Sequence, residues 1–273
     1  MEKRWIAYPY HIWMAIFTVV PLALIVFYAF TLPNEFTFSL ENIKRVMEPL
    51  YLEVLLRSIY LALVSTVICF IIGYPMALIL SETSIKYRNM LVLMVVIPMW
   101  MNFLLRTYAW MTLLERKGLI NSILTNLHLP TINILYTDYA VILGMVYNFL
   151  PFMILPIYSV LMKLDKSLLE AADDLGANKW TSFRKITFPL SLPGVYAGMI
   201  MVFMPAVTTF VISRLLGGGQ YMLIGNLIEQ QFLAIGDWNF GASLSVVMMA
   251  LILCSLAFMG RYEKDNRGGG MFW

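Results

Sequence analysis

Long apolar runs that lack charged residues constrain this chain more than any other feature of its sequence. A helix needs about 20 such residues to cross the hydrocarbon core of a bilayer. Five runs reach that length, and a sixth does so if it continues past Arg106 to Leu114. The sequence therefore predicts an all-α integral membrane protein with six transmembrane helices. The predicted spans are residues 11–30, 58–80, 89–114, 139–162, 194–213 and 238–260.

Composition and charge distribution agree with a membrane protein. Hydrophobic residues make up 60% of the 273 residues and charged residues only 13%, whereas a soluble domain carries about 25% charged residues. With the N-terminus in the cytoplasm, the inner segments hold twelve Lys and Arg residues and the outer segments six, with Arg106 inside a span. This asymmetry follows the positive-inside rule. Both termini and segment 163–193 are predicted to be cytoplasmic, and the net charge of +3 gives no reason to expect nucleic-acid binding.

Motifs of catalysis and metal binding are missing from the sequence. The two His residues have no metal-ligand spacing, and neither a G-x-S-x-G nor a G-x-x-x-x-G-K-[ST] motif occurs. Cys69 and Cys254 each lie within a predicted span, and we interpret them as small packing residues rather than a disulfide or a metal site. The chain is not predicted to be an enzyme or to hold a cofactor, so energy for any work must enter from a partner.

Several features predict bends and short elements between the spans. Ser39 can cap a short helix outside the membrane. The run 215–228 is uncharged but too short and too glycine-rich to span, and we expect it to dip into the protein, shielded from lipid. A membrane helix tolerates one proline, but five prolines that kink four of the predicted spans fit a bundle that surrounds a cavity. These prolines are Pro75, Pro98, Pro151, Pro156 and Pro205.

The longest polar interruption in the second half of the chain runs from Leu168 to Gly194 and reads LLEAADDLGANKWTSFRKITFPLSLPG. Ser167 and Glu170 form an S-x-x-E capping box, which predicts the start of a short helix. Gly176 is a natural C-terminal stop for that helix. The first part of the interruption is therefore predicted to be a short cytoplasmic helix.

A second short helix is predicted directly after this stop. Asn178 can cap it, and it should end before Pro189. Trp180 and Phe183 are large side chains that can anchor the segment to a partner. The alternative is an ordinary amphipathic connector resting on the membrane.

These residues resemble a known motif. Glu170-Ala171-Ala172, three residues, Gly176, nine residues and Ile186-x-x-Pro189 are similar to the EAA loop of ABC importer permeases, with Phe188 where that family has Leu. In that family the loop is the coupling helix, which sits in a cleft of the cytoplasmic ATPase. The resemblance implies ATPase-coupling roles for Glu170, Ala171, Ala172, Asp174, Leu175, Gly176, Trp180 and Phe183.

The resemblance covers most of the chain and is greatest to the spermidine/putrescine permeases. It implies one permease domain over residues 1–273, with type I ABC importer architecture, in the cell membrane of a prokaryote. It also implies polyamine import together with a second homologous permease, two ATPase subunits that bind ATP and Mg, and an extracytoplasmic polyamine-binding protein. The similar stretches are YLEVLLRSIYLALVST, RTYAWMTLL, YNFLPFMILPIYSVL, LLEAADDLGA, IGNLIEQQF and DWNFGASLS.

A path for flexible polycations should offer carboxylates and aromatic faces. Asp237 could instead cap the last helix, and Trp238 could belong to an interfacial aromatic belt. Arg106 does not suit a cation path, and we expect it to snorkel to the outer interface. The substrate-path candidates are Asp237, Trp238, Tyr147, Asn148 and Glu115.

Two other interpretations stay open at this point. The same architecture could carry another solute, such as another organic cation or an inorganic ion. From a different class, the chain could be a membrane scaffold or receptor that does not transport and binds a cytoplasmic partner through residues 163–193.

Overall fold

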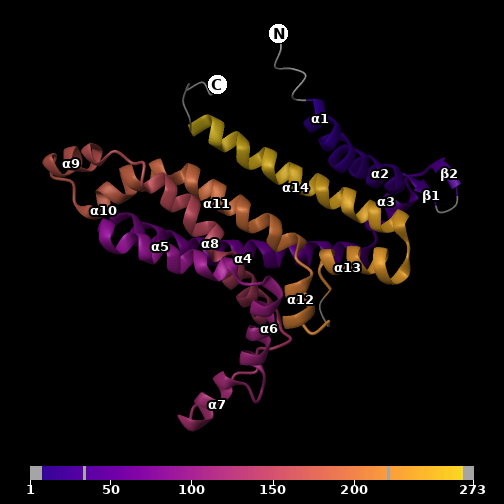
Figure 1. The fold of residues 1–273 in the computed structure, drawn as a ribbon, viewed down its shortest axis with the longest axis horizontal. Coiled ribbons are helices and arrows are strands. Elements are labelled where there is room, and N and C mark those ends of the chain that lie inside the picture. Colours follow the sequence, from indigo (N-terminus) through magenta and orange to yellow (C-terminus); the bar gives the residue numbers. More distant parts are fainter. Residues whose placement is uncertain (1–7, 33–34, 220–221, 267–273) are drawn as a thin grey trace.

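The computed structural model describes residues 8–32, 35–219 and 222–266, which are almost entirely helical. Figure 1 shows long helices lying side by side, with α9 and α10 at one end and α6 and α7 projecting from the rest. The elements of the first half are α1 (Tyr8–Met14), the π-helical turn η2 (Ala15–Val19), α2 (Val20–Ala29), β1 (Thr31–Leu32), β2 (Glu35–Phe38), α3 (Glu41–Val46), α4 (Pro49–Glu82), α5 (Ile85–Trp100), α6 (Phe103–Leu114) and α7 (Leu119–Asn126). Those of the second half are α8 (Asp138–Leu161), α9 (Lys166–Asp174), α10 (Lys179–Ser182), η3 (Phe183–Thr187), α11 (Phe188–Thr208), α12 (Val211–Leu216), α13 (Ile224–Gln230), η4 (Gln231–Ile235) and α14 (Trp238–Asn266).

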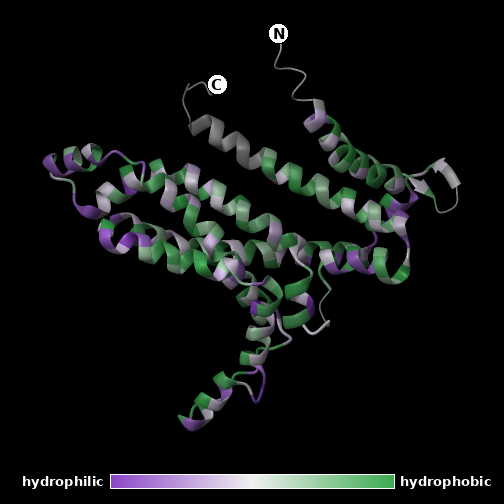
Figure 2. Ribbon diagram, viewed as in Figure 1, coloured by the Kyte–Doolittle hydropathy of each residue, from purple (hydrophilic) through white to green (hydrophobic). Residues whose placement is uncertain are grey.

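Within the described residues, five helical segments are long and apolar enough to cross a membrane, and a bent pair of helices makes a sixth if it counts as one span. Figure 2 shows hydrophobic residues along these helices and hydrophilic residues gathered at α9 and α10. The five segments are Pro9–Ala29, Pro49–Glu82, Asp138–Leu161, Lys179–Thr208 and Trp238–Ala257.

The third predicted span, residues 89–114, is not one continuous helix. α5 ends at Trp100, and the chain bends by 92° before it continues. The Asn102 carboxamide oxygen accepts hydrogen bonds from the backbone N–H groups of Leu104 at 2.9 Å and Leu105 at 3.3 Å, so it starts a new helix. Pro98 lacks an N–H one turn earlier and weakens the same stretch. The prediction of one continuous helix over residues 89–114 was therefore wrong.

The fifth predicted span, residues 194–213, was placed too late in the chain. The helix that was expected to end before Pro189 instead runs from Lys179 through η3 into α11 and stops at Thr208. A π-helical turn changes the hydrogen-bonding pattern just before the proline, whose missing N–H would interrupt a regular α-helix. The segment predicted to couple to an ATPase, residues 163–193, is thus continuous with a membrane helix. It is called the coupling segment below.

The core lies where α4, α8 and α11 pack against one another, while α14 packs against α2. Met145, Met153 and Ile157 of α8 are fully buried there. α11 approaches α8 closely at Gly194 and Gly198, since a Cβ at either position would lie within 3 Å of α8 atoms. Small residues at such crossings allow helix backbones to come together in lipid.

The segment predicted to dip into the protein, residues 215–228, runs from the end of α12 into α13, and both helices pack against the bundle. Leu223 and Ile224 are buried, and the Ile224 N–H donates to the Ser58 hydroxyl of α4 at 2.8 Å. Asn226 holds the two short helices together, since its Nδ2 donates to the Phe210 carbonyl at 2.8 Å. The two ends of this segment therefore pack against the bundle, whereas Gly218, Gly219 and Met222 between them are exposed.

Candidate coupling segment and substrate path

The start of α9 differs from the predicted capping box. Asp165 is the N-cap, and its Oδ1 accepts from the Ser167 backbone N–H at 3.0 Å. Hydrogen bonds from the Ser167 backbone and then from its side chain lower the pKa of the Asp165 carboxyl. Glu170 lies beyond the first turn and caps nothing, so the Ser167/Glu170 box was wrong. Asp and Ser are nearly equal as N-caps, and here Asp165, two positions before Ser167, takes the role.

The end of α9 and the start of α10 follow the prediction. Gly176 adopts a φ of +77°, the left-handed conformation that ends helices and that glycine accepts without strain. The Asn178 side chain then accepts from the Thr181 N–H at 2.8 Å and caps α10. The two short helices therefore meet at a defined bend.

This bend presents an apolar and acidic surface at one end of the molecule (Figure 1). The Leu175 side chain is 88% exposed and the Trp180 side chain 68% exposed. Glu170 is exposed and makes no hydrogen bond or ion pair with any residue that the structure describes. We define the coupling surface as the six exposed members of the predicted set, which are Glu170, Ala171, Asp174, Leu175, Gly176 and Trp180.

Two predicted coupling residues face the protein instead. Ala172 is the buried residue of α9, and Phe183 is half-buried against Tyr74 of α4 and Phe188. They can support the coupling surface but do not form part of it.

Tyr147 and Asn148 lie on α8, one turn before the kink residue Pro151. Asn148 is buried, and its Nδ2 donates to the Gly144 carbonyl at 2.9 Å, whereas its Oδ1 has no hydrogen-bond partner among the described residues. An unpaired buried acceptor is costly. This oxygen therefore lacks a donor in the described residues, although Asn148 is not among the residues that line the cavity beside Tyr147.

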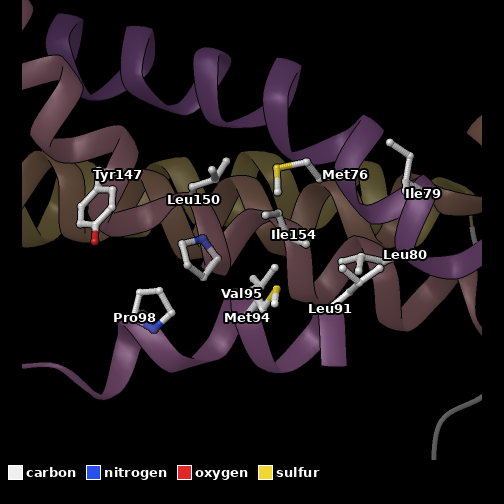
Figure 3. Close-up of a pocket in the computed structure, with 11 residues that line it drawn as sticks. Met76, Ile79, Leu80, Leu91, Met94, Val95, Pro98, Tyr147, Leu150 and Ile154 are labelled. Carbon is white, nitrogen blue, oxygen red and sulfur yellow. The ribbon is translucent and has the colours of Figure 1, made fainter. Parts of the chain in front are cut away.

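The Tyr147 ring lines a cavity of about 410 Å³ between α4, α5 and α8 (Figure 3). It also packs edge-on against Trp110 of α6, with ring centroids 5.3 Å apart. Pro98 and Pro151, both inside helices, contribute to the cavity wall. The remaining lining is aliphatic, so the Tyr147 ring and hydroxyl are the features of this cavity that suit an organic cation.

Asp237 is engaged in two structural interactions. Its Oδ1 accepts from the Phe240 N–H at 3.0 Å and caps α14, and its Oδ2 lies 3.1 Å from Arg45 Nη1. The Arg45 guanidinium in turn lies 4.0 Å from the centre of the Phe240 ring. The capping alternative for Asp237 therefore has direct structural support.

Asp237→Asn should lower the free energy of unfolding by less than about 1 kcal/mol, because asparagine keeps the cap and loses only a partly exposed ion pair. Asp237→Ala should lower it by about 1–2 kcal/mol, because the cap is lost as well. Thermal unfolding of the purified complex checks both values. A severe transport defect in a normally assembled Asp237→Asn complex would instead assign the carboxylate to the substrate path.

The remaining path candidates lie apart from Tyr147 and Asn148, which we call the α8 pair. Trp238 is exposed at the start of α14 and packs edge-on against Phe232 at 5.6 Å. Glu115 is exposed at the end of α6, beside a second cavity of about 450 Å³ that also contacts Arg116 and Lys117. The five candidates therefore do not form one site within the described part of this chain.

Arg106 does not snorkel to an interface. Its side chain is buried, and neither Nε nor Nη1 has a hydrogen-bond partner among the described residues. The break at Asn102 redirects α6 so that it packs against α12, and Arg106 therefore does not continue along the axis of α5 toward an interface. Asn102, a preferred N-cap residue shortly after a proline, was the sequence signal for this break.

Comparisons with known proteins show the family to which this chain belongs. The family described as "Binding-protein-dependent transport system inner membrane component" matches residues 3–268. The spermidine/putrescine transport system permease protein PotB of Escherichia coli K12 is 42% identical over 251 residues, covering 88% of this chain and 91% of PotB. PotB of Haemophilus influenzae is 40% identical over 251 residues, covering 88% of each chain.

A solved structure supports the fold. In the bacterial alginate ABC transporter in complex with an alginate pentasaccharide-bound periplasmic protein, one chain matches with a TM-score of 0.83 and 17% identity. The match covers 99% of this chain and 98% of that one. At this identity the likeness concerns the fold alone. Together with the sequence match over nearly the whole chain, it shows that this multi-pass membrane protein belongs to the family of inner-membrane components of binding-protein-dependent transport systems.

Proposed function

We propose that this chain is a permease subunit of an ATP-driven importer of polyamines, spermidine and putrescine. The observation that carries the proposal is the 42% identity to a spermidine/putrescine permease over 91% of that protein. A match over 88% of this chain leaves only a small part of it outside the comparison.

The coupling surface is proposed to dock on a cytoplasmic ATPase. Its exposed leucine and tryptophan provide apolar contact area, and Glu170 provides an unpaired carboxylate for a basic group of the partner. The sequence has no phosphate-binding loop, so ATP and Mg would be bound by the ATPase. This chain contributes docking and movement, not hydrolysis.

The proposed assembly contains a second homologous permease, two ATPase copies and an extracytoplasmic polyamine-binding protein. The bias of Lys and Arg supports a cytoplasmic location for the coupling surface and both termini. Native mass spectrometry of the purified complex should find one copy of this chain. Two copies in a complex that transports would contradict the paired-permease arrangement.

Within this chain, the α8 pair is the part of the substrate path that the geometry supports best. Tyr147 offers a π face to a substrate ammonium group, and Asn148 offers an unpaired oxygen. Asp237, Trp238 and Glu115 lie on predicted outer segments, where they could meet the polycation as it enters. Their contributions are proposed to be weaker, since Asp237 is already paired with Arg45.

Uptake by vesicles containing the complete complex tests the function. Labelled spermidine or putrescine should accumulate only when both ATP and the binding protein are supplied. A complex whose ATPase cannot hydrolyse ATP is the control for binding without transport. ATP hydrolysis that the binding protein stimulates without polyamine uptake would contradict the polyamine assignment.

The alternative is the same architecture carrying another solute. A chain of the same fold belongs to an alginate transporter, so the fold does not determine the solute. Competition of unlabelled organic cations, inorganic ions and sugars against labelled spermidine separates the two. Membership of a transport family argues against a scaffold that does not transport.

A further inference from the structure

The coupling segment is joined covalently to α8 and α11 but not to α4. α8 precedes α9 in the chain, and α11 continues from α10 through η3. α4 ends more than 80 residues earlier, at Glu82. Movement of the coupling segment can therefore reach α4 only through non-covalent packing, chiefly that of α4 against α8 and α11.

A cluster of aromatic side chains forms one of these contacts, between the coupling segment and α4. We define the aromatic bridge as Trp180, Phe183, Phe188 and Tyr74. Trp180 stacks on Phe183 with ring centroids 5.6 Å apart and planes 24° apart. Phe183 meets the Tyr74 ring edge-on at 5.9 Å, and Phe188 lies 5.6 Å from Tyr74. The bridge runs from the exposed coupling surface to a tyrosine that is 6% exposed.

A buried hydrogen bond closes the inner end of the bridge. The Tyr74 hydroxyl lies 2.8 Å from the Ser191 hydroxyl of α11. Ser191 donates its own hydrogen to the Phe188 carbonyl at 2.8 Å, so Tyr74 must be the donor to Ser191. A directional bond of this kind fixes the Tyr74 ring between α4 and α11.

Tyr74 lies between a proline that weakens the hydrogen bonding of α4 and a glycine that packs closely against α8. Pro75 follows it and removes a hydrogen bond from the helix. Gly73 precedes it, and a Cβ there would lie 3.0 Å from Met153 of α8. Force applied to Tyr74 therefore acts on a helix that can bend at this point.

The stretch of α4 that follows Tyr74 forms part of the cavity wall that faces Tyr147. Met76, Ile79 and Leu80 line this cavity opposite α5 (Figure 3). A shift of α4 at Pro75 would change the shape of the cavity. The bridge thus connects the coupling surface to the wall of the proposed substrate path.

We propose that Tyr74 is a positioning residue that transmits movement of the coupling segment to α4 through its hydroxyl bond to Ser191. The proposal rests on the proposed transport function. It separates two steps at the coupling segment, because the exposed surface docks on the ATPase and the aromatic bridge transmits the movement.

Tyr74→Phe tests the hydroxyl alone, since it keeps the ring and the packing. The measurement is solute transported per ATP hydrolysed in vesicles of the complete complex. We expect normal assembly, ATP hydrolysis within about twofold of wild type, and a ratio that is about three- to tenfold lower, the size of one net hydrogen bond. Tyr60→Phe is the matched control, because Tyr60 lies exposed on the same helix.

Ser191→Ala supplies a double-mutant cycle with Tyr74→Phe. Loss of one shared bond predicts that the double variant has the ratio of the Tyr74→Phe single variant rather than a multiplied defect. An unchanged ratio in Tyr74→Phe would overturn the proposal. So would a loss of hydrolysis in proportion to uptake, which indicates docking, or a failure to assemble, which indicates a structural role. If the wild type carries another solute, only the polyamine assignment fails, and the ratio is measured with that solute.

Discussion

Glu170→Gln should lower ATP-driven uptake and stimulated ATP hydrolysis together, by about tenfold or more, without unfolding the subunit. The Glu170 side chain is exposed, makes no hydrogen bond or ion pair with the described residues and lies beyond the first turn of α9, so the fold of the subunit does not depend on its charge. A hydrogen bond to a charged group at an interface contributes about 1.5–3 kcal/mol, and glutamine keeps the size but not the charge. Parallel assays of hydrolysis and uptake in the reconstituted complex measure the effect.

Asp165 and Asp173 supply the controls for this experiment. Asp165→Ala removes the cap and should lower the stability of α9 by about 1 kcal/mol, whereas Asp165→Asn keeps the cap. Asp173→Asn deletes a charge from the same helix at a residue outside the predicted coupling set. Wild-type activity in Glu170→Gln would show that charge at this position is not needed for docking. A defect in Asp173→Asn of the same size would indicate a general charge effect on α9.

The Glu170 and Tyr74 variants are expected to fail in different ways. Loss of docking lowers hydrolysis and uptake in parallel, because the ATPase no longer engages the permease. Loss of the aromatic bridge leaves hydrolysis in place and lowers the transport obtained from it. The ratio of the two rates therefore distinguishes the exposed surface from the buried contact behind it.

The apolar runs predicted the membrane helices because the length needed to cross lipid is set by the bilayer and not by the rest of the protein. The breaks within them were harder to predict. Hydropathy is similar on both sides of Met101, so a window average carries no sign of the bend at Asn102. The position of the bend is set locally by the Asn102 side chain, which accepts hydrogen bonds from the N–H groups of Leu104 and Leu105.

The coupling segment was predictable where a residue type has one strong preference. Gly176 and Asn178 have the predicted roles, since left-handed backbone favours glycine and caps favour asparagine. The start of α9 was not predictable in this way, because Asp165 and Ser167 compete as caps of similar strength. The bond between Tyr74 and Ser191 joins residues 117 positions apart. Local pattern cannot reveal such a pair, which forms only once α4 and α11 are packed.

Gly194→Val should cause the largest loss of stability among these variants, about 3 kcal/mol or more. A Cβ at Gly194 would lie 2.9 Å from the Pro156 carbonyl oxygen and 3.0 Å from the Ile157 Cα. Both are backbone atoms of α8, which cannot turn aside as a flexible side chain could. Valine would therefore force α8 and α11 apart, at the place where they hold the two ends of the coupling segment.

Fluorescence-detected size-exclusion chromatography of membrane extracts measures this effect as the yield of folded subunit. Gly194→Ala should give an intermediate yield, because one methyl group meets the same backbone atoms with less bulk. Gly176→Ala is the contrasting control, since its Cβ would have nothing within 4 Å but its φ of +77° strains any other residue. That strain is about 1–2 kcal/mol and should leave the subunit folded. A wild-type yield for Gly194→Val would mean that α8 and α11 are not held at this spacing. The glycine would then not position the coupling segment.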